Sequence, residues 1–332
     1  MKNFRKIAFC FAMFELAVLF VGCGNSSDVP LFAFVNFGNS STSEKTITFG
    51  AFPQSLKKES VTVDENEKKK VGLYTYYRGS DGEWYVKLYP SYYKVEPIKW
   101  TVLTTNYNGK KLLLAKNVLL TCKYYDYLGG NRNMSGNTVY PNNYKYSRIR
   151  AYLNGYSYYE KSGSSAQVNN SSFENKGFLQ TAFTSDERAK IVTVRLDNSE
   201  RSTNPDENAS QWNGGSNKYA CEDTSDKVFL LSSQEITKAE YGFFTSEARN
   251  VDGNTRIRKP TAYAAAYEPY MNPDDGEYVW WWLRSPAYDG KNDCSVRAVG
   301  SNGYAAGSVS VNGSDGVHNY TGGVVPALCL EN

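Results

Sequence analysis

The sequence is poor in the residues that enzymes use for acid–base and nucleophilic chemistry. Its 332 residues include a single histidine, His318, which lies in a glycine-rich stretch rather than beside a nucleophile motif. It contains no Gly-x-Ser-x-Gly, no His-Glu-x-x-His and no phosphate-binding glycine loop. We therefore predict no catalytic residues, no cofactor and a protein that is not an enzyme.

Metal-ligand patterns are also scarce. Four of the six cysteines lie beyond the N-terminal segment, and their spacing matches no Cys-x-x-Cys pairing of a zinc site. These four are Cys122, Cys221, Cys294 and Cys329. We interpret them as buried thiols, with up to two disulfides as the alternative. Residues 272–277 carry oxygen ligands that suit Ca²⁺, but their Asn-Pro and Asp-Gly pairs favour a solvated turn, so no metal is predicted.

The N-terminal segment has the features of a lipoprotein signal peptide. A basic start is followed by the apolar run 7–21, which is short of the ~20 residues of a spanning helix. Gly22-Cys23 then resembles a lipobox, the site at which signal peptidase cleaves before a lipidated cysteine. We predict that 1–22 is a signal peptide, that Cys23 carries the lipid and that 23–45 is a tether. A plain signal peptide or a membrane anchor is the alternative.

Charge gives no support for a nucleic-acid partner. The whole chain has a formal net charge of +3, and removing 1–22 lowers it to about +1. We predict no nucleic-acid partner and a membrane association through the lipid. The predicted location is the cell envelope, at the outer surface of the outer membrane.

The last fifty residues have the most informative composition. An aromatic block at 280–286 and an apolar, glycine-led segment at 322–328 enclose 288–320, which is rich in Tyr, Asp, Asn, Ser and Gly. Tyr, Ser, Gly and Asn dominate evolved binding loops, because Tyr gives a large contact area at low entropic cost. We interpret 288–320 as a binding face held between two core-forming segments. A pair of polar hairpins with ordinary turns is the alternative.

Some residue types are depleted from the same window. Lys, Glu, Gln, Met and Trp make up 58 of the 332 residues, so about six are expected in 33 positions, yet only Lys291 occurs. The codons of these five amino acids end in a purine. Random substitution at the first two bases of an asparagine codon ending in a pyrimidine cannot produce them. The depletion is consistent with a segment rewritten in that way.

Capping residues and β-branched runs predict the regular elements. Three helices are expected, from the N-caps Ser147, Thr184 and Ser232 to about Leu153, Ile191 and Tyr241. Strands are expected at 98–103, 111–115, 192–196 and 228–231. Trp100 and Trp280 to Trp282 are core candidates by size, and Arg284 is expected to brace the fold. The tyrosines of 124–159 are expected to pack an insertion against the sheet. A sugar-stacking platform, or a set of residues that flank the main binding face, is the alternative.

An ordered set of motifs carries a family resemblance. They are ITFG (47–50), FPQ (52–54), PIKWTVL (97–103), LLLAK (112–116), SRIRAYLN (147–154), 178–191, VFLLS (228–232), PTAYA (260–264), WWWLRSP (280–286) and GGVVPAL (322–328). The set resembles the variable proteins of diversity-generating retroelements, which have a C-type lectin fold of the formylglycine-generating-enzyme type. Val325 stands where that family usually has an arginine.

The resemblance implies an α+β, C-type lectin-like fold of mixed short strands, a few helices and long loops. It would form one domain at 46–332, with a variable region at about 287–321. The implied function is a surface-displayed ligand-binding lipoprotein whose C-terminal face is diversified by a retroelement. The implied partner is a protein or glycan of a host or neighbouring cell.

Two other functions remain open. One is a formylglycine-generating or related oxidase, although Cys294 and Cys329 are 35 positions apart, whereas that enzyme needs a close pair. The other is a structural envelope protein without a ligand.

The candidate contacts all lie in the variable region. They are Tyr288, Asp289, Asp293, Ser295, Arg297, Ala298, Ser301, Asn302, Tyr304, Ser308, Ser310, Asn312, Ser314, Asp315, His318, Asn319 and Tyr320. In the expected strands, Val296, Val299, Val309 and Val311 point inward. Ser295, Arg297 and Ala298 are expected to face the ligand, as are Ser308, Ser310 and Asn312.

Overall fold

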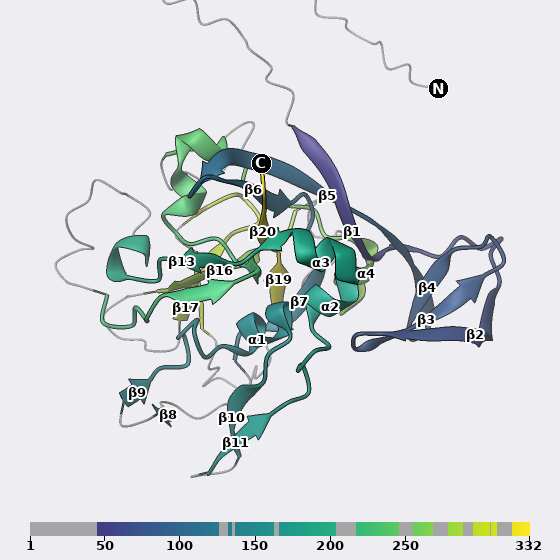
Figure 1. Ribbon diagram of the computed structural model, residues 1–332, viewed down its shortest axis with the longest axis horizontal. Coiled ribbons are helices and arrows are strands. Elements are labelled where there is room, and N and C mark those ends of the chain that lie inside the picture. The colour runs from purple at the N-terminus through teal and green to yellow at the C-terminus, as the bar shows by residue number, and fades with distance from the viewer. Residues whose placement is uncertain are drawn as a thin grey trace, which may run out of the picture. The chain divides into compact units, whose positions relative to one another are not determined.

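A computed structural model shows a β-rich protein built on two main sheets (Figure 1). It describes residues 45–125, 132–134, 137–162, 166–203, 217–245, 255–267, 278–287, 295–305, 307–310 and 321–332. The predicted signal peptide, Cys23 and almost all of the predicted tether lie outside these ranges, as do 272–277. Glu44–Asn332 forms one compact unit. No helix within the described ranges is long and apolar enough to cross a membrane.

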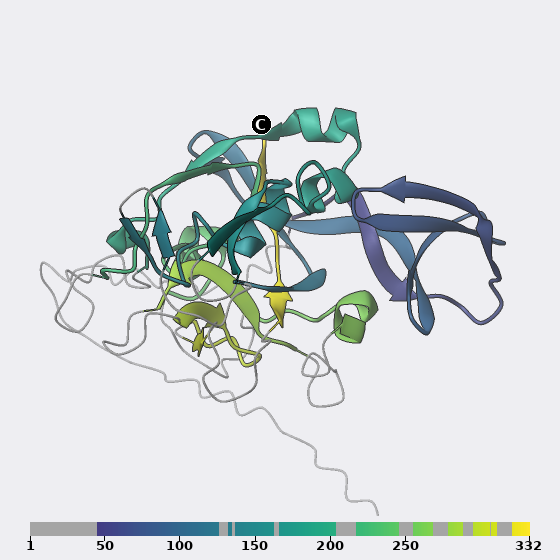
Figure 2. The ribbon, with the colours of Figure 1, turned by 90° about the horizontal axis from the view of Figure 1, so that it is seen from below.

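The larger sheet has nine strands, all paired antiparallel. They are β1 (Thr46–Leu56), β2 (Val63–Val71), β3 (Tyr74–Gly79), β4 (Trp84–Leu88), β5 (Ser91–Tyr107), β6 (Lys110–Ala115), β12 (Ile191–Val192), β15 (Val228–Phe229) and β20 (Ala327–Leu330). The long strand β5 pairs with β1 and β4 through its first part and with β6 through its last part. In Figures 1 and 2, β2, β3 and β4 extend to one side of the remaining strands.

The smaller sheet has five strands in the order β18-β17-β16-β19-β7. They are β7 (Leu120–Lys123), β16 (Trp281–Pro286), β17 (Ser295–Val299), β18 (Gly307–Ser310) and β19 (Thr321–Val324). β16 and β19 run parallel, and the other pairs are antiparallel. Three two-stranded sheets complete the strands of the described residues, formed by β8 (Arg132–Met134) with β9 (Asn137–Val139), β10 (Tyr158–Ser162) with β11 (Ala166–Asn170), and β13 (Val194–Leu196) with β14 (Thr224–Asp226).

Two of the three predicted helices are confirmed. In α1 (Arg148–Asn154), Ser147 accepts a hydrogen bond from the Arg150 backbone at 3.2 Å, and Gly155 ends the helix at φ 74°. In α3 (Ser185–Lys190), Thr184 and Glu187 form the predicted reciprocal capping box. The described residues also form α2 (Phe178–Ala182), α4 (Ala262–Tyr267) and the 3₁₀ turn η1 (Glu200–Thr203).

The third predicted helix is wrong in form. Ser232 and Glu235 do exchange the expected capping hydrogen bonds, at 2.8 and 3.2 Å. The chain then forms two 3₁₀ turns, η2 (Glu235–Thr237) and η3 (Ala239–Tyr241), because Lys238 between them has an extended backbone. The predicted strand at 192–196 is also divided, since β12 pairs with β20 and β13 pairs with β14.

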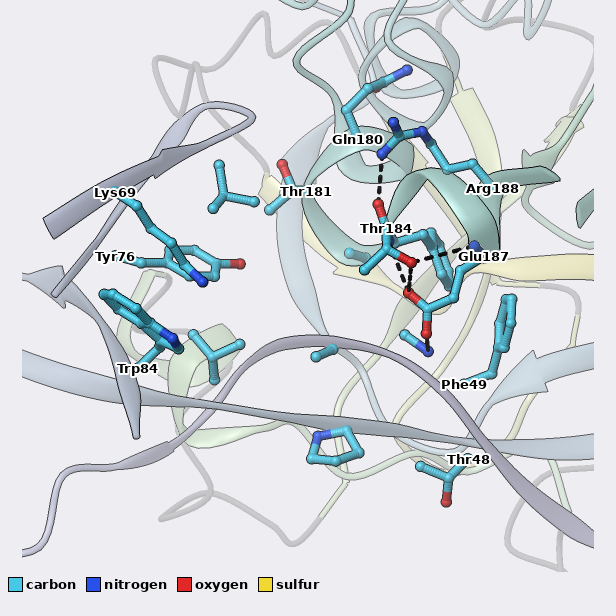
Figure 3. A pocket seen from close by; sticks show the side chains of 17 residues that line it. Thr48, Phe49, Lys69, Tyr76, Trp84, Gln180, Thr181, Thr184, Glu187 and Arg188 are labelled. Atoms are coloured by element: carbon cyan, nitrogen blue, oxygen red, sulfur yellow. Dashed lines mark hydrogen bonds between the residues drawn. The ribbon is translucent and has the colours of Figure 1, made fainter. Parts of the chain in front are cut away.

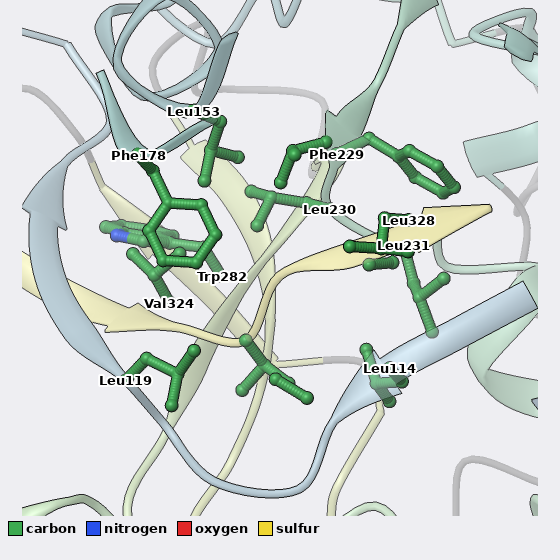
Figure 4. Packing of buried hydrophobic residues seen from close by; sticks show 14 of the residues in the cluster. Leu114, Leu119, Leu153, Phe178, Phe229, Leu230, Leu231, Trp282, Val324 and Leu328 are labelled. Carbon is green, nitrogen blue, oxygen red and sulfur yellow. The ribbon is translucent and has the colours of Figure 1, made fainter. Parts of the chain in front are cut away.

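One cluster of buried apolar side chains joins the sheets and short helices. Figure 4 shows Trp282, Val324 and Leu328 among the leucines of the neighbouring elements. Trp100, Trp281 and Trp282 have no exposed surface, which confirms their predicted place in the core. Their indole N–H groups each donate to a backbone carbonyl, as buried indoles require.

The tyrosine-rich insertion packs mainly into the same core. Tyr124, Tyr144, Tyr152 and Tyr158 are buried, and Tyr156 is 40% exposed. The packing interpretation is therefore confirmed for these four side chains.

Strands predicted at 98–103 and 111–115 are confirmed within β5 and β6.

Candidate functional site

The aromatic block forms the buried central strand of the smaller sheet. All six residues of β16 are buried, and Trp282 donates from Nε1 to the carbonyl of Cys122 at 3.0 Å. A Cβ on Gly322 would overlap Trp282 Nε1 and the Trp280 ring, so only glycine lets β19 approach this closely. The two segments that enclose 288–320 in the sequence thus pack against each other in the structure.

Arg284 ties this strand to the rest of the fold. Its guanidinium donates to Glu235, to the carbonyls of Leu230 and Asp197, and to the Asn198 side chain. Only 2% of its side chain is exposed. The prediction that Arg284 braces the fold is confirmed, and it is not accessible to a ligand.

The start of β17 and the end of β18 lie side by side in the smaller sheet. Ser295 is the first residue of β17 and Ser310 is the last residue of β18, and the two are direct partners in the antiparallel register. The chain therefore enters β17 beside the point at which it leaves β18. The register also places Val296 opposite Val309.

A tight turn lies at the other end of β17. The backbone N–H of Gly300 donates to the backbone carbonyl of Tyr304 at 2.9 Å, and Gly303 has φ 78°. Asn302 accepts from the Tyr304 backbone through its side chain at 3.1 Å. Ser301 is exposed, and Asn302 and Tyr304 are partly buried. These three candidates therefore lie together, at the end of β17 opposite Ser295.

The predicted orientation of three β17 residues is wrong. Ser295, Arg297 and Ala298 were expected to face the ligand, but they are 4%, 6% and 2% exposed. β17 lies between β16 and β18, and Asn142 from the loop before α1 donates to the Ser295 carbonyl at 3.1 Å. All five residues of β17 are buried, so both faces of the strand are covered. Val296 and Val299 are buried, as predicted.

The remaining candidates divide into two groups. Ser308 and Ser310 lie in β18. The others lie outside the described residues, and they are Tyr288, Asp289, Asp293, Asn312, Ser314, Asp315, His318, Asn319 and Tyr320. Val311 is also outside them.

The described cysteines are buried or partly buried thiols. Cys122, Cys221 and Cys329 form no disulfide within the described part of the chain, which agrees with the thiol interpretation for these three, and Cys294 lies outside it. Burial raises the pKa of the Cys329 thiol to about 12 and also raises that of Cys221, which disfavours the reactive thiolate. Over the same described ranges, no group of three or more His, Cys, Asp or Glu side chains is placed to hold a metal ion.

Comparisons with known proteins identify the family of most of the chain. Searches of curated proteins and of solved structures found no match. Residues 108–332 match the family described as a domain of unknown function, DUF6273. The match includes β6 through β20, whereas β1 through β5 precede it. This chain belongs to the DUF6273 family.

Proposed function

We propose that the protein is a surface-displayed lipoprotein that binds a protein or glycan ligand through the C-terminal face, and that a retroelement diversifies this face. The pairing of Ser295 with Ser310 carries the proposal, because it brings two separate parts of the variable segment to one place on the sheet. The proposed fold is the C-type lectin type suggested by the motifs, and the β-rich architecture is consistent with it.

The strands next to these segments form a buried framework, which can support a binding face of variable sequence. Trp281, Trp282, Val296 and Val299 are fully buried, as is Val324 at the end of β19. Binding residues are often carried on loops that a rigid scaffold positions. Substitutions in 288–294 and 311–320 would alter the binding surface while this buried framework stays the same.

The proposed contacts exclude the three buried residues of β17. Tyr288, Tyr304 and Tyr320 would supply rigid aromatic contacts, and Asp289, Asp293, Asp315 and His318 would set the polarity. Ser295, Arg297 and Ala298 would instead support the strand from which the contacts extend.

The proposed attachment is a lipid on Cys23. Cleavage after Gly22 would leave this cysteine as the first residue, followed by the tether that precedes β1. A tether rich in Ser, Asn and Gly behaves as a flexible chain and would hold the binding face away from the membrane.

A binding screen tests the ligand-binding part of the proposal. The labelled protein is applied to a glycan array and to intact host-type cells, beside a Tyr288→Ala, Asp315→Ala, His318→Ala variant. The control is Arg195→Ala, because Arg195 is exposed on β13, which belongs neither to the smaller sheet nor to the variable segment. We expect saturable binding that the triple variant loses and the control keeps. Equal binding by all three proteins would contradict the assignment of the face.

A further inference from the structure

A cavity lies far from the variable region in the sequence, between the β2–β4 extension and the turn from α2 to α3. Its volume is about 650 Å³, and β1 and β5 contribute to its walls. Figure 3 shows Lys69, Tyr76 and Trp84 on one side and the residues of α2 and α3 on the other. Apolar side chains that include Phe49, Val95 and Phe183 complete the lining. Volumes and linings of this kind are typical of small-molecule sites.

The Tyr76 hydroxyl is a buried polar group directed into this cavity (Figure 3). Tyr76 is 5% exposed, and among the described residues its Oη has no hydrogen-bond partner. Burial raises the pKa of Tyr76 well above its usual range, so the hydroxyl keeps its proton and can donate. A buried hydroxyl without a partner is costly, and an acceptor inside the cavity would remove that cost.

Lys69 places a positive charge beside this hydroxyl. It pairs with Tyr76 across β2 and β3, and its Nζ lies 4.0 Å from the centre of the Trp84 ring and 6.0 Å from that of Tyr76. Within the described ranges no carboxylate forms an ion pair with Lys69. The ammonium therefore lies over aromatic faces with donors still available.

The one carboxylate that lines the cavity is already engaged. Glu187 accepts from the Gly50 backbone at 3.2 Å through one oxygen, and from the Thr184 backbone at 2.8 Å through the other. Arg188, also in the lining, donates to the Phe183 carbonyl at 2.6 Å. The lining thus has two cations against one hydrogen-bonded anion, and this balance favours an anionic ligand.

We propose that this cavity binds an organic monoanion with a flat apolar body, such as an aromatic carboxylate. The acid group would accept hydrogen bonds from Lys69 Nζ and Tyr76 Oη. The apolar body would lie against Trp84, Phe49 and Phe183. The site is independent of the variable face, and it lies largely on strands that precede the family match.

Calorimetric titration of the full chain with 2-naphthoate tests the proposal, with neutral 2-naphthylmethanol as the matched probe. We expect the naphthoate to bind about tenfold more tightly than the alcohol, since a hydrogen bond to a charged group is worth about that factor. Lys69→Met should lower naphthoate affinity about tenfold and leave the alcohol unchanged. Tyr76→Phe should also lower naphthoate affinity several-fold.

Lys68→Met is the control, because adjacent residues of a strand point to opposite faces and Lys68 pairs with Tyr77 instead. It should bind naphthoate like the wild type. Tyr76→Phe should keep or raise the melting temperature, since it removes a buried hydroxyl that has no partner among the described residues. Absence of naphthoate binding, equal affinity for the alcohol, or equal losses in Lys68→Met and Lys69→Met would overturn the proposal.

Discussion

Arg284 and Glu235 form an ion pair inside the protein, with side chains only 2% and 8% exposed. It joins β16 of the smaller sheet to the turn η2, and the Tyr107 hydroxyl from β5 donates to the same carboxylate at 2.8 Å. Burial opposes ionisation of Glu235, but the Arg284 charge and these hydrogen bonds outweigh it and lower the pKa of Glu235 below its ordinary value. The pair therefore fixes the strand that precedes the variable segment.

Breaking this pair should destabilise the protein strongly. We expect Glu235→Gln to lower the free energy of unfolding by roughly 3–5 kcal/mol, because it leaves the Arg284 charge buried and uncompensated. Glu331→Gln is the matched control, since Glu331 pairs with Lys110 at the surface and such pairs contribute about 0–1 kcal/mol. Urea unfolding of both variants measures the difference. Similar losses of unfolding free energy in the two variants would show that the buried pair stabilises the fold no more than the surface pair does.

The same pair should make stability depend on pH in the acid range. The folded-state pKa of Glu235 lies below the unfolded value of about 4.3. The ionised carboxylate therefore contributes its full amount to the free energy of unfolding at any pH above about 4.3. This stabilisation is lost as the pH falls through the folded-state pKa of Glu235. The melting-temperature gap between wild type and Glu235→Gln should stay constant from pH 7 to about 5 and narrow below about 4. A gap that persists undiminished in strong acid would contradict this assignment.

Core and face should differ in their tolerance to substitution. Trp282→Ala should cost roughly 3–5 kcal/mol, because it removes a fully buried indole together with its hydrogen bond to Cys122. Changing Tyr288, Asp289, Asn312 and Tyr320 together should cost within about 0.5 kcal/mol each, as surface substitutions do. Thermal unfolding of the two variants compares them. Equal losses would count against a fixed scaffold with a changeable face.

Lipid attachment predicts a simple change of location. Cys23→Ala removes the sulfur that would carry the lipid, so the variant should pass from the detergent phase to the aqueous phase and should not incorporate labelled palmitate. Cys221→Ala is the control, because its thiol lies in the described fold. If the Cys23→Ala protein stays with the membrane, a spanning anchor takes the place of the lipid.

Local capping chemistry was sufficient to predict some elements. Ser147 and Thr184 satisfy backbone donors within three residues of themselves, so α1 and α3 could be located from short stretches of sequence. The turn at Glu235 was only half predicted, because Lys238 interrupts the helix and the carboxylate is held by Arg284, 49 positions away.

The misplaced features depend on distant neighbours. Alternation along β17 suggested one exposed face, but all five of its residues are buried, and no local pattern in the sequence shows what packs on the second face. No motif contains Lys69, Tyr76 or Trp84, although ITFG (47–50) and 178–191 supply other parts of the cavity lining. Its residues come from the five strands β1 to β5 and meet residues of α2 and α3 about a hundred positions later in the sequence.

Sequencing the same locus from several isolates tests the central claim most directly. If a retroelement diversifies this face, an almost identical repeat should lie near a reverse-transcriptase gene. Differences between isolates should fall at adenines of that repeat, within codons for positions at about 287–321. The codons of Trp281, Trp282 and Val324 should stay the same, because these residues form the buried framework. Differences spread evenly along the gene, with no such repeat, would contradict the account.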